Sequence, residues 1–511
     1  MSAGVSYVTG LVELMPEPKK LMDEGWGPDA LEVRRENIRR HYDENVEKVN
    51  FYIKQHTYFH SLIGQAFRHL ISPGRRVLQV GCHEPGNFLQ KVNAKEGVCV
   101  DISAEMIRVS KEEHPQYQYY RSPDETIPDL EPFDDIIITN GSEVADIHDS
   151  LVDLKKCIRE DTRIFIYNYN RLWEPVVKFA EATGLKFPQI ERNWLSTDDI
   201  NGFLRSAGYE TLKVYRKVLF PFRIPLVSWI LNEIVASLSL VNYLCLVNIF
   251  VARIVPKPVD TKTISVSVVI PCKNEFQNIE MAVERIPEMG AHTEIIFCDD
   301  KSTDGTANEI IRMQTEHPER DIKLFEGPGI CKAENVWTGF NGATGDVLMI
   351  LDADLSVMPE KLPQFLEVLA AGHAEFVNGS RMVYPMQSNA MRGLNILGNK
   401  AFSIIFRMIL EQSIKDTLCG TKVFWRKDWP RLRALVGSWG ISDRWGDFDL
   451  LFSAAKVQLK IIDLPVHYQD RIHGETKMTR RLRNAAIMAR ICCAAFWKLR
   501  RGSEWTGRIT R

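Results

Sequence analysis

The segment Gly345-Asp-Val-Leu-Met-Ile-Leu-Asp352-Ala-Asp354 places five consecutive apolar residues directly before two carboxylates. An uninterrupted apolar run of this length is typical of a strand covered on both faces. Open α/β sheets bind their ligands at the carboxyl ends of such strands. Alternate residues at a strand end point the same way, so Asp352 and Asp354 can reach one divalent cation. Taken alone, the pair is only a weak indication of a metal site.

Two apolar runs upstream end in the same manner. Residues 264–270 precede Pro271-Cys-Lys-Asn274-Glu275, and residues 294–298 precede Asp299-Asp300-Lys-Ser302-Thr-Asp304-Gly305. Lys332 begins a predicted helix shortly before the Asp-x-Asp strand. Each acidic strand end, taken singly, is better explained as a solvated loop or a helix cap. Their succession favours one shared site at the carboxyl edge of a sheet.

These motifs resemble, in order, those of a family 2 glycosyltransferase with the GT-A fold, on the branch of dolichyl- or undecaprenyl-phosphate sugar synthases. The resemblance covers residues 264–478. It implies that Asp352 and Asp354 hold Mg²⁺ or Mn²⁺ on the diphosphate of a nucleotide-sugar donor. The nucleotide-sugar-binding residues that it implies are Pro271, Asn274, Glu275, Asp300 and Lys332. One departure is Lys301, where glycine is usual; it concerns the loop conformation and not the activity.

The resemblance continues downstream through motifs ending at Arg381, Lys422, Asp449 and Lys477. A polyprenyl-phosphate acceptor is already ionised at neutral pH, so the protein needs mainly to position it and neutralise charge. We expect Arg381, Arg471 and Lys477 to bind the acceptor phosphate. Asp449 is the best nearby carboxylate if a hydroxyl group of a glycan acceptor needs a base. A helix N-terminal charge explains Asp449 about equally well.

The N-terminal half contains a different pattern. A predicted strand, residues 76–80, ends in a turn from Gly81 to Gly86, and a second strand, residues 97–100, ends at Asp101. This separation between a glycine turn and an acidic residue is typical of a βαβ unit that binds a nucleoside.

This stretch, from about residue 35 to residue 253, resembles the class I S-adenosylmethionine-dependent methyltransferases. The resemblance implies that Gly81 and Gly86 line the methionine part of the cofactor, that Asp101 holds the ribose and that Ile102 flanks the adenine. Gln79 stands where an acidic residue is usual, and the glycine loop has an extra residue. Whether this half transfers a methyl group or only binds a cofactor or partner therefore stays open. No catalytic base can be named.

The length of 511 residues agrees with two α/β domains. We expect a Rossmann-like methyltransferase fold over 1–255, a linker over 256–263, a GT-A nucleotide-sugar-binding fold over 264–478 and a basic amphipathic tail over 479–511. The 64 basic and 66 acidic side chains give no reason to expect nucleic acid as a partner.

The ten cysteines show no paired metal-binding spacing. Those in apolar runs (Cys99, Cys245 and Cys298) are expected to be buried thiols of a reducing compartment and not a disulfide framework. The N-terminus has no pattern of a secretory signal. We therefore expect a cytoplasmic protein, with peripheral contact at the cytoplasmic membrane face as a further expectation.

Two segments were considered for contact with a membrane. Residues 224–255 form a long apolar stretch, but four polar residues (Asn232, Glu233, Asn242 and Asn248) argue against a spanning helix. From Arg471 to Arg511 the chain has eleven basic and two acidic residues. A helix over 480–501 would suit an anionic membrane surface. A helix packed on the domain, with a solvated basic face, explains it nearly as well.

The sequence thus predicts a bifunctional transferase, an inverting glycosyltransferase fused to an S-adenosylmethionine-dependent methyltransferase. In the alternative, the glycosyltransferase is active and the N-terminal domain is a non-catalytic binding module. A third hypothesis, a scaffold with inactive sites, is disfavoured by the intact Asp-x-Asp motif and its companions.

Overall fold

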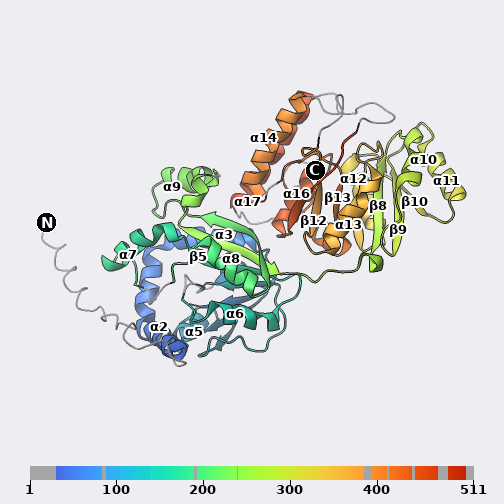
Figure 1. Ribbon diagram of the computed structural model, residues 1–511. Helices are drawn as coiled ribbons and strands as arrows, with labels where there is room; N and C mark the ends of the chain where they lie inside the picture. The colour runs from blue at the N-terminus through green and yellow to red at the C-terminus, as the bar shows by residue number, and fades with distance from the viewer. Residues whose placement is uncertain are drawn as a thin grey trace. The chain divides into compact units, whose positions relative to one another are not determined.

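The computed structural model describes residues 30–82, 88–139, 141, 143–188, 193–238, 240–384, 393–410, 412, 414–439, 443–469 and 481–501 (Figure 1). The chain divides into two compact units, Met1–Ile254 and Val255–Arg511. The division falls just before the polar, proline-containing segment 256–263.

The N-terminal unit is built on a seven-stranded sheet in the order β3-β2-β1-β4-β5-β7-β6. The first five strands of this order are parallel, and β7 runs antiparallel to both of its neighbours. The order 3-2-1-4-5 is that of a Rossmann-type sheet, so the predicted Rossmann-like fold is confirmed. The strands are β1 Arg76–Val80, β2 Glu96–Asp101, β3 Gln118–Arg121, β4 Asp135–Ile138, β5 Arg163–Tyr169, β6 Tyr209–Lys217 and β7 Val247–Ile254.

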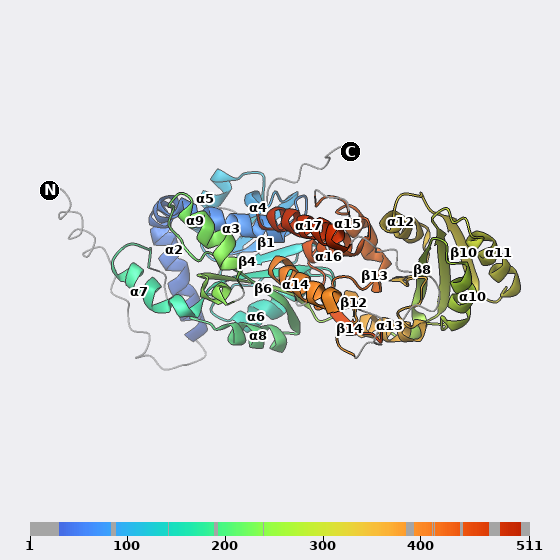
Figure 2. The ribbon, with the colours of Figure 1, turned by 90° about the horizontal axis from the view of Figure 1, so that it is seen from above.

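Helices cover both faces of this sheet (Figure 2). One face packs against α2 Ala30–Gln55, α3 Thr57–Leu70, α4 Phe88–Lys91 and α5 Ala104–Glu113, and the other against α6 Ile147–Asp153 and α8 Thr197–Ser206. Val77 belongs to the first apolar layer and Leu78 to the second, because successive strand residues point to opposite faces. The remaining helical elements are η2 Leu154–Cys157, η3 Arg171–Trp173, α7 Glu174–Ala182, α9 Val227–Trp229, η4 Ile230–Ile234, η5 Val235–Ser237 and η6 Val241–Leu244.

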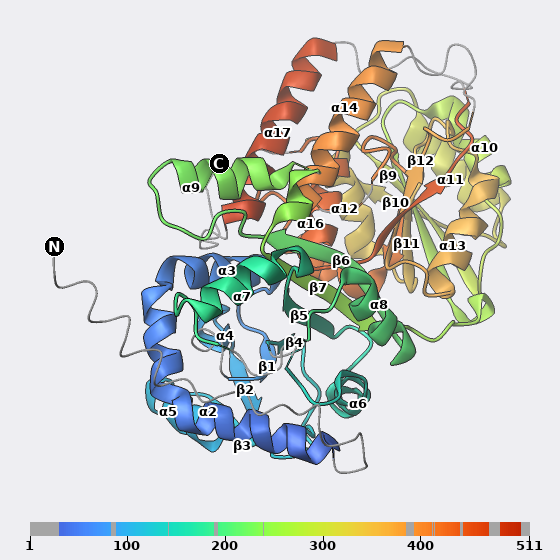
Figure 3. The same ribbon diagram turned by 60° about the vertical axis from the view of Figure 1, so that its left-hand side comes forward.

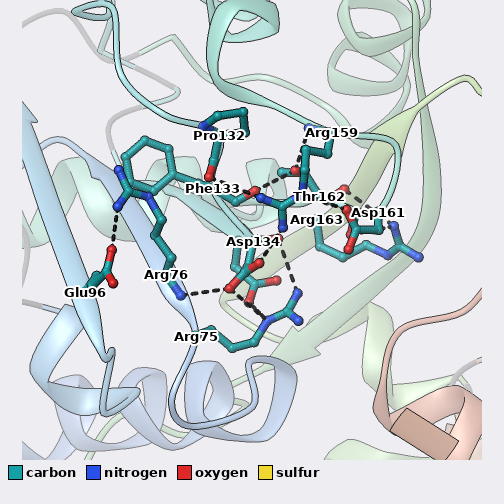
Figure 4. Close-up of polar contacts among 11 residues, drawn as sticks. Arg75, Arg76, Glu96, Pro132, Phe133, Asp134, Arg159, Asp161, Thr162 and Arg163 are labelled. Carbon is teal, nitrogen blue, oxygen red and sulfur yellow. Dashed lines mark hydrogen bonds and ion pairs between the residues drawn. The ribbon is translucent and has the colours of Figure 1, made fainter. Parts of the chain in front are cut away.

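A polar network closes the amino end of this sheet (Figure 4). Asp134 accepts hydrogen bonds from the backbone N–H of Arg76 at 2.9 Å and from Arg159 Nη2 at 2.5 Å. Arg75 Nε donates to Asp135 Oδ2 at 2.9 Å. Burial opposes ionisation of Asp134, but its donors outweigh burial and hold the pKa below its ordinary value. The network lies opposite the end where α/β sheets bind ligands, so we assign it a structural role.

Cys82 and Cys99 form a disulfide. Cys82 follows β1, and Cys99 lies in the neighbouring parallel strand β2. The prediction of a buried thiol is therefore wrong at Cys99, because the βαβ connection brings together two cysteines that are 17 residues apart. Cys245 and Cys298 are buried thiols as predicted, and burial raises the pKa of Cys298 to about 12.

The C-terminal unit has its own seven-stranded sheet, in the order β10-β9-β8-β11-β13-β12-β14. The first four strands of this order are parallel, and β13 runs antiparallel to β11 and β12. The strands are β8 Ser265–Cys272, β9 His292–Asp299, β10 Asp321–Glu326, β11 Val347–Ile350, β12 Phe376–Ser380, β13 Lys422–Trp425 and β14 Ile461–Pro465.

This second sheet is also covered on both faces. One apolar layer includes α10 Phe276–Arg285, α11 Thr306–Glu316 and α13 Leu362–Ala370. The other includes α12 Lys332–Gly342, α14 Gly393–Leu410, α15 Trp429–Arg433, α16 Asp447–Lys456 and α17 Arg481–Arg501. Short 3-10 turns complete the unit, namely η7 Thr261–Thr263, η8 Pro359–Lys361 and η9 Arg426–Asp428. The buried strand predicted before Asp352 is confirmed, because all four residues of β11 are buried.

Helix α17 lies beside α14 (Figure 3). Four of its apolar residues, Met488, Ile491, Cys492 and Ala495, are buried in the core of the C-terminal unit. Arg483 and Arg490 are exposed. The apolar face of the helix is thus used for packing within the unit, and these two arginines face solvent. No helix within the described part of the chain is long and apolar enough to cross a membrane.

Candidate functional site

The loops that follow β8, β9, β10 and β11 gather at the carboxyl end of the C-terminal sheet. They are bonded to one another through the backbone. Asp300 N donates to Cys272 O at 2.9 Å, and Gly327 N donates to Asp299 O at 2.8 Å. Leu351 N donates to Val269 O at 3.1 Å. The predicted motifs at these strand ends therefore lie along one edge, as the parallel pairing requires.

Asp352 pairs with the lysine that begins α12. Lys332 Nζ lies 2.5 Å from Asp352 Oδ1. The alternation of β11 explains the pairing: Leu348 and Ile350 face the layer that contains α12, and Asp352 continues the same series. Burial raises the pKa of Asp352, but Lys332 outweighs it and the pKa lies below its ordinary value. Asp352 is therefore held as a carboxylate.

Asp354 lies two residues further on and is 8% exposed. Its Oδ1 accepts a hydrogen bond from Ser356 N at 3.0 Å, which fixes the turn after β11. Asp352, Asp447 and Asp354 together raise the pKa of Lys332 against the opposing effect of burial. The lysine thus stays protonated among three carboxylates.

Asp447 was not singled out from the sequence, although it lies in the Gly446–Asp449 motif. It is the first residue of α16, and Lys422 Nζ lies 2.6 Å from its Oδ1. Lys422 also lowers the pKa of Asp352. Asp352, Asp354, Asp447, Lys332 and Lys422 therefore form one cluster of alternating charge, which we name the carboxylate–lysine cluster.

A glycine keeps the space beside this cluster free of side chains. A Cβ atom at Gly420 would lie 2.3 Å from Asp352 Oδ2. Among the residues that the structure describes, no group of three or more His, Cys, Asp or Glu is arranged to hold a metal ion.

Asn274 and Glu275 shape the first loop. Asn274 adopts φ of +53° and its Oδ1 accepts from Thr303 N at 2.9 Å, which joins the loops after β8 and β9. Glu275 Oε2 accepts from Asn278 Nδ2 at 2.8 Å. Pro271, in β8, is partly exposed. These three predicted residues lie together at the strand end.

Asp300 has two partners in neighbouring loops. Lys273 Nζ lies 3.1 Å from its Oδ2, and Gly329 N donates to its Oδ1 at 2.7 Å. Lys273 is thus a second basic group at this edge that sequence reasoning did not select. The next residue, Lys301, has φ of +59°. This left-handed conformation favours glycine, which explains why the resemblance expects glycine there.

Arg381 is occupied by an internal partner. Its Nε and Nη2 donate to the two carboxylate oxygens of Asp416 at 2.7 and 2.8 Å. Asp416 is fully buried, and burial of Arg381 is outweighed by this carboxylate, which raises the arginine pKa. The guanidinium lies 5.1 Å from the ring centroid of Tyr468. Arg381 therefore holds the loop that leads to Gly420, and two of its donor atoms are engaged.

The neighbours of Asp449 are not members of the carboxylate–lysine cluster. It is 3% exposed, and its Oδ2 accepts from Gly437 N at 3.2 Å. Its Oδ1 is buried and makes no hydrogen bond. Burial and the neighbouring Asp443 raise the pKa of Asp449 to about 8. Arg471 and Lys477, the other two residues expected to bind the acceptor phosphate, lie outside the described residues.

A cavity in the N-terminal unit lies at the carboxyl ends of β1, β2 and β4. Asp101 and Ile102 line it, together with apolar side chains such as Val144 and Ile147. Asp101 Oδ1 accepts from Ser103 N at 2.7 Å, and its Oδ2 accepts from Cys82 N at 2.5 Å. The structure thus places two of the predicted cofactor-binding residues at one cavity.

The glycine turn beside this cavity begins as predicted. Gly81 has φ of +89°, and its N–H donates to Val100 O at 2.8 Å. Gly86 lies outside the described residues. Gln79 Nε2 donates to Gly81 O at 2.8 Å, and its Oε1 accepts from Phe88 N at 2.9 Å. Gln79, which stands where an acidic residue is usual, therefore joins the two ends of the glycine loop.

Residues 267–453 match the model of glycosyl transferase family 2. The chain carries a family 2 glycosyltransferase domain. A dolichol-phosphate mannosyltransferase of Pyrococcus furiosus is 36% identical over 120 residues, which is 23% of this chain and 33% of that relative. An undecaprenyl-phosphate mannosyltransferase of Micrococcus luteus is 27% identical over 236 residues, covering 45% of this chain and 95% of the relative. The chain spans 39% and 49% of the length of two further relatives.

A solved S-adenosylmethionine-dependent methyltransferase of Thermotoga maritima is similar to part of the chain. It is 14% identical, covers 42% of this chain and 99% of its own, and has a TM-score of 0.34.

Within the glycosyltransferase domain, the family match covers β8 to most of α16 and therefore includes the whole carboxylate–lysine cluster. Lys332 brings an ammonium group to this strand end, and such a group can pair with a phosphate as well as with Asp352. Three carboxylates and two lysines gathered at the carboxyl end of the sheet suit the transfer of a group from a diphosphate.

Proposed function

We propose that the glycosyltransferase domain, taken as residues 264–478, moves a sugar from a nucleotide-sugar to a polyprenyl-phosphate or cell-envelope glycan acceptor, with inversion at the anomeric carbon. The observation that carries the proposal is the carboxylate–lysine cluster at the carboxyl end of β11. The proposal is supported by the family match and by relatives that are named as polyprenyl-phosphate sugar transferases.

The cluster fits a divalent cation. Asp352 and Asp354 supply hard oxygen ligands on one turn, and Gly420 leaves room beside Asp352. Mg²⁺ is generally held by one or two carboxylates together with substrate phosphates and water, and Mn²⁺ suits the same oxygen ligands. Bound at these two residues, Mg²⁺ or Mn²⁺ would neutralise negative charge on the leaving nucleoside diphosphate.

The chain's own residues provide the rest of donor binding. Pro271, Glu275 and Asp300 would contact the base and ribose, and Asn274 holds their loops together. Lys332 holds the pKa of Asp352 below its ordinary value, and its ammonium group would contact a donor phosphate. Preorganised charges of this kind act without reorganisation during the reaction.

The acceptor needs little base catalysis if it is a phosphate. We propose Arg471 and Lys477 as its ligands, with Arg381 acting mainly through Asp416 to position the Asp416–Lys422 loop. For a hydroxyl acceptor, Asp447 and Asp449 are the competing candidates for the base. Asp447 is favoured by its place in the cluster and Asp449 by its raised pKa.

For the N-terminal domain, taken as residues 1–255, we propose that it binds S-adenosylmethionine. Asp101 ends β2 at the cavity, where a carboxylate can accept from ribose hydroxyls, and the apolar wall that includes Ile102 suits adenine. The cofactor would supply an activated methyl group, and methylation of the sugar product is the function proposed for it. A non-catalytic binding module is the alternative, because no side chain at the cavity is identified as a base.

One experiment addresses both halves. The full chain is incubated with a panel of labelled nucleotide-sugars, Mn²⁺ and polyprenyl phosphate or a membrane lipid extract. Label should appear in a lipid-extractable product for one donor. Adding methyl-labelled S-adenosylmethionine should then label the same product. Sugar transfer without methyl transfer, in a protein that binds the cofactor, would favour the alternative, and no transfer from any donor would refute the proposal.

A further inference from the structure

In the segment between β6 and β7, residues 218–246, several polar side chains are buried and many apolar side chains are exposed, the opposite of an ordinary surface segment. Four of its polar residues, Ser228, Asn232, Glu233 and Ser237, are buried. Ten large apolar side chains are exposed, namely Phe222, Ile224, Leu226, Val227, Ile230, Ile234, Leu238, Leu240, Tyr243 and Leu244. Single exposed apolar residues are ordinary, but a contiguous group marks an interaction surface.

The buried polar groups fix this arrangement. Lys217 Nζ lies 3.0 Å from Glu233 Oε1, and both side chains are buried. Asn232 Oδ1 accepts from Leu219 N and Phe220 N, each at 2.9 Å. Ser228 Oγ accepts from Ile224 N at 2.6 Å. The segment is thus attached to its unit by hydrogen bonds and an ion pair, which leaves its apolar face unpartnered.

Helical spacing gathers the exposed residues on one face. Ile230 and Ile234 are separated by four residues and therefore lie one above the other, while Ser228 and Asn232 lie on the inward side. Leu226, directly before the first helical turn, is 69% exposed. Leu240, at 88% exposure, continues the apolar surface beyond the helical turns.

The neighbouring loop after β5 extends the surface. Trp173 Nε1 donates to Leu244 O at 2.8 Å, which holds η3 and the start of α7 against the end of the segment. Leu172, Val176 and Phe179 there are more than half exposed. Tyr169, at the end of β5, pairs with Val247, at the start of β7. The surface therefore lies at the carboxyl end of the N-terminal sheet, the end that holds the cofactor cavity.

The few charged residues of this segment indicate which kind of partner suits the surface. Residues 218–246 contain two charged side chains, Arg223 and Glu233. Glu233 is buried in its pair with Lys217, and Arg223 is exposed. The segment thus presents apolar groups, one tyrosine and one cation, with no exposed carboxylate. This composition suits entry into the interface of a bilayer, where apolar side chains lie at the acyl boundary and a cation meets lipid phosphates.

We propose that residues 218–246, with the adjoining start of α7, form a membrane-docking surface of the N-terminal unit, and that its partner is a phospholipid bilayer. The segment lies in the interface and does not span it. The inference does not rest on sugar or methyl transfer. It places the carboxyl end of the N-terminal sheet next to lipid, so a membrane-embedded acceptor could reach the cofactor cavity.

Co-sedimentation of the full chain with vesicles tests the proposal. The variant is Leu226→Asp/Leu240→Asp, in which two exposed residues of the surface gain charge. The matched control is Phe51→Asp/Ile311→Asp, which adds the same two charges at residues that are 58% and 51% exposed elsewhere. Vesicles are pure phosphatidylcholine, or phosphatidylcholine with phosphatidylglycerol at a ratio of about 7 to 3, the anionic arm reporting charge attraction.

The wild type and the control should bind both kinds of vesicle, and binding to phosphatidylcholine should persist at high salt because apolar insertion is not screened. The surface variant should lose at least about tenfold in partitioning, since membrane binding scales with the apolar area inserted. Circular dichroism should match among the three proteins.

Equal vesicle binding by the surface variant and the wild type would overturn the proposal. So would binding that high salt abolishes. Sedimentation velocity identifies another occupant: a wild-type dimer that fails to bind vesicles, and that dissociates in the surface variant, would assign the surface to a second copy. A monomer that fails to bind either vesicle would also refute membrane docking.

Discussion

Replacing the buried Asp449 by asparagine should stabilise the protein at neutral and alkaline pH. Asp449 is 3% exposed, one of its oxygens makes no hydrogen bond, and Asp443 adds repulsion. These effects raise its pKa from an ordinary 3.8 to about 8. Between these two values the folded state holds a proton that the unfolded state has lost, so stability falls as pH rises through this window. Below about pH 4 the carboxyl group is protonated in both states, and its contribution vanishes.

The size of the effect follows from the two pKa values. A difference from 3.8 to about 8 corresponds to an upper bound of about 6 kcal/mol above pH 8, at about 1.4 kcal/mol for each unit. Local rearrangement and water entry reduce this, so we expect Asp449→Asn to add about 1–3 kcal/mol at pH 8. In a unit of this size that corresponds to roughly 3–10 °C in Tm.

Thermal unfolding followed by circular dichroism between pH 4 and pH 8.5 measures the difference. Asp443→Asn is the contrasting variant, because Asp443 accepts hydrogen bonds from the backbone of Trp445, Phe448 and Asp449 and an amide oxygen cannot replace both carboxylate oxygens. It should be less stable than the wild type. An Asp449→Asn protein that is no more stable at pH 8, or whose gain grows toward acid, would refute the reasoning. Retained sugar transfer would also exclude Asp449 as the base.

Three further predictions concern other parts of the molecule. Asp101→Ala should weaken S-adenosylmethionine binding by roughly 1.5–3 kcal/mol, the range for hydrogen bonds to a charged group, and unchanged affinity in calorimetry would contradict the ribose assignment. Lys301→Gly should raise the free energy of unfolding by about 0.5–1 kcal/mol, because it relieves a left-handed φ; a loss in denaturant titration would refute this. Arg483→Gln/Arg490→Gln should weaken binding to anionic vesicles by roughly 1–2 kcal/mol at low salt without affecting neutral ones, and equal binding to the anionic vesicles would leave α17 as a packing element only.

The Asp-x-Asp strand was predictable because its information is local. Five apolar residues specify a buried strand, and the period of two places Asp352 on the same side as Ile350. The face occupied by α12 then brings Lys332 to that carboxylate. The Rossmann-like fold of the N-terminal half was likewise predictable, since a glycine turn and an acidic strand end at the right separation are typical of that fold.

The choice between Asp447 and Asp449 was not accessible from the sequence. Both lie in one motif at the start of α16, and two positions along a helix differ by about 200° around its axis. One carboxylate therefore faces Lys422 and the other the interior. Which of the two carboxylates faces Lys422 depends on how α16 packs against the rest of the unit.

Long-range pairings were missed for a related reason. Arg381 and Asp416 belong to two separate motifs, 35 residues apart, and the sequence analysis assigned Arg381 to the acceptor phosphate without foreseeing this internal partner. Cys82 and Cys99 become neighbours only through the parallel pairing of β1 and β2. In the β6–β7 segment, Asn232 and Glu233 argued against a spanning helix. That both side chains point inward was not predicted, because Glu233 pairs with Lys217 and Asn232 accepts from the backbone N–H of Leu219.

The central claim, a cation-assisted glycosyltransferase centred on Asp352 and Asp354, is tested most directly by the rate of sugar transfer with Mn²⁺, with chelator and in Asp354→Asn. The matched control is Asp346→Asn, just before the opposite end of the same strand, where the carboxylate accepts from the backbone N–H and the hydroxyl of Ser265. We predict that chelator and Asp354→Asn each lower turnover at least about a hundredfold, the range for removing one key electrostatic group, while Asp346→Asn keeps turnover within about threefold because it touches no part of the site. Full activity in chelator, or in Asp354→Asn, would contradict the account.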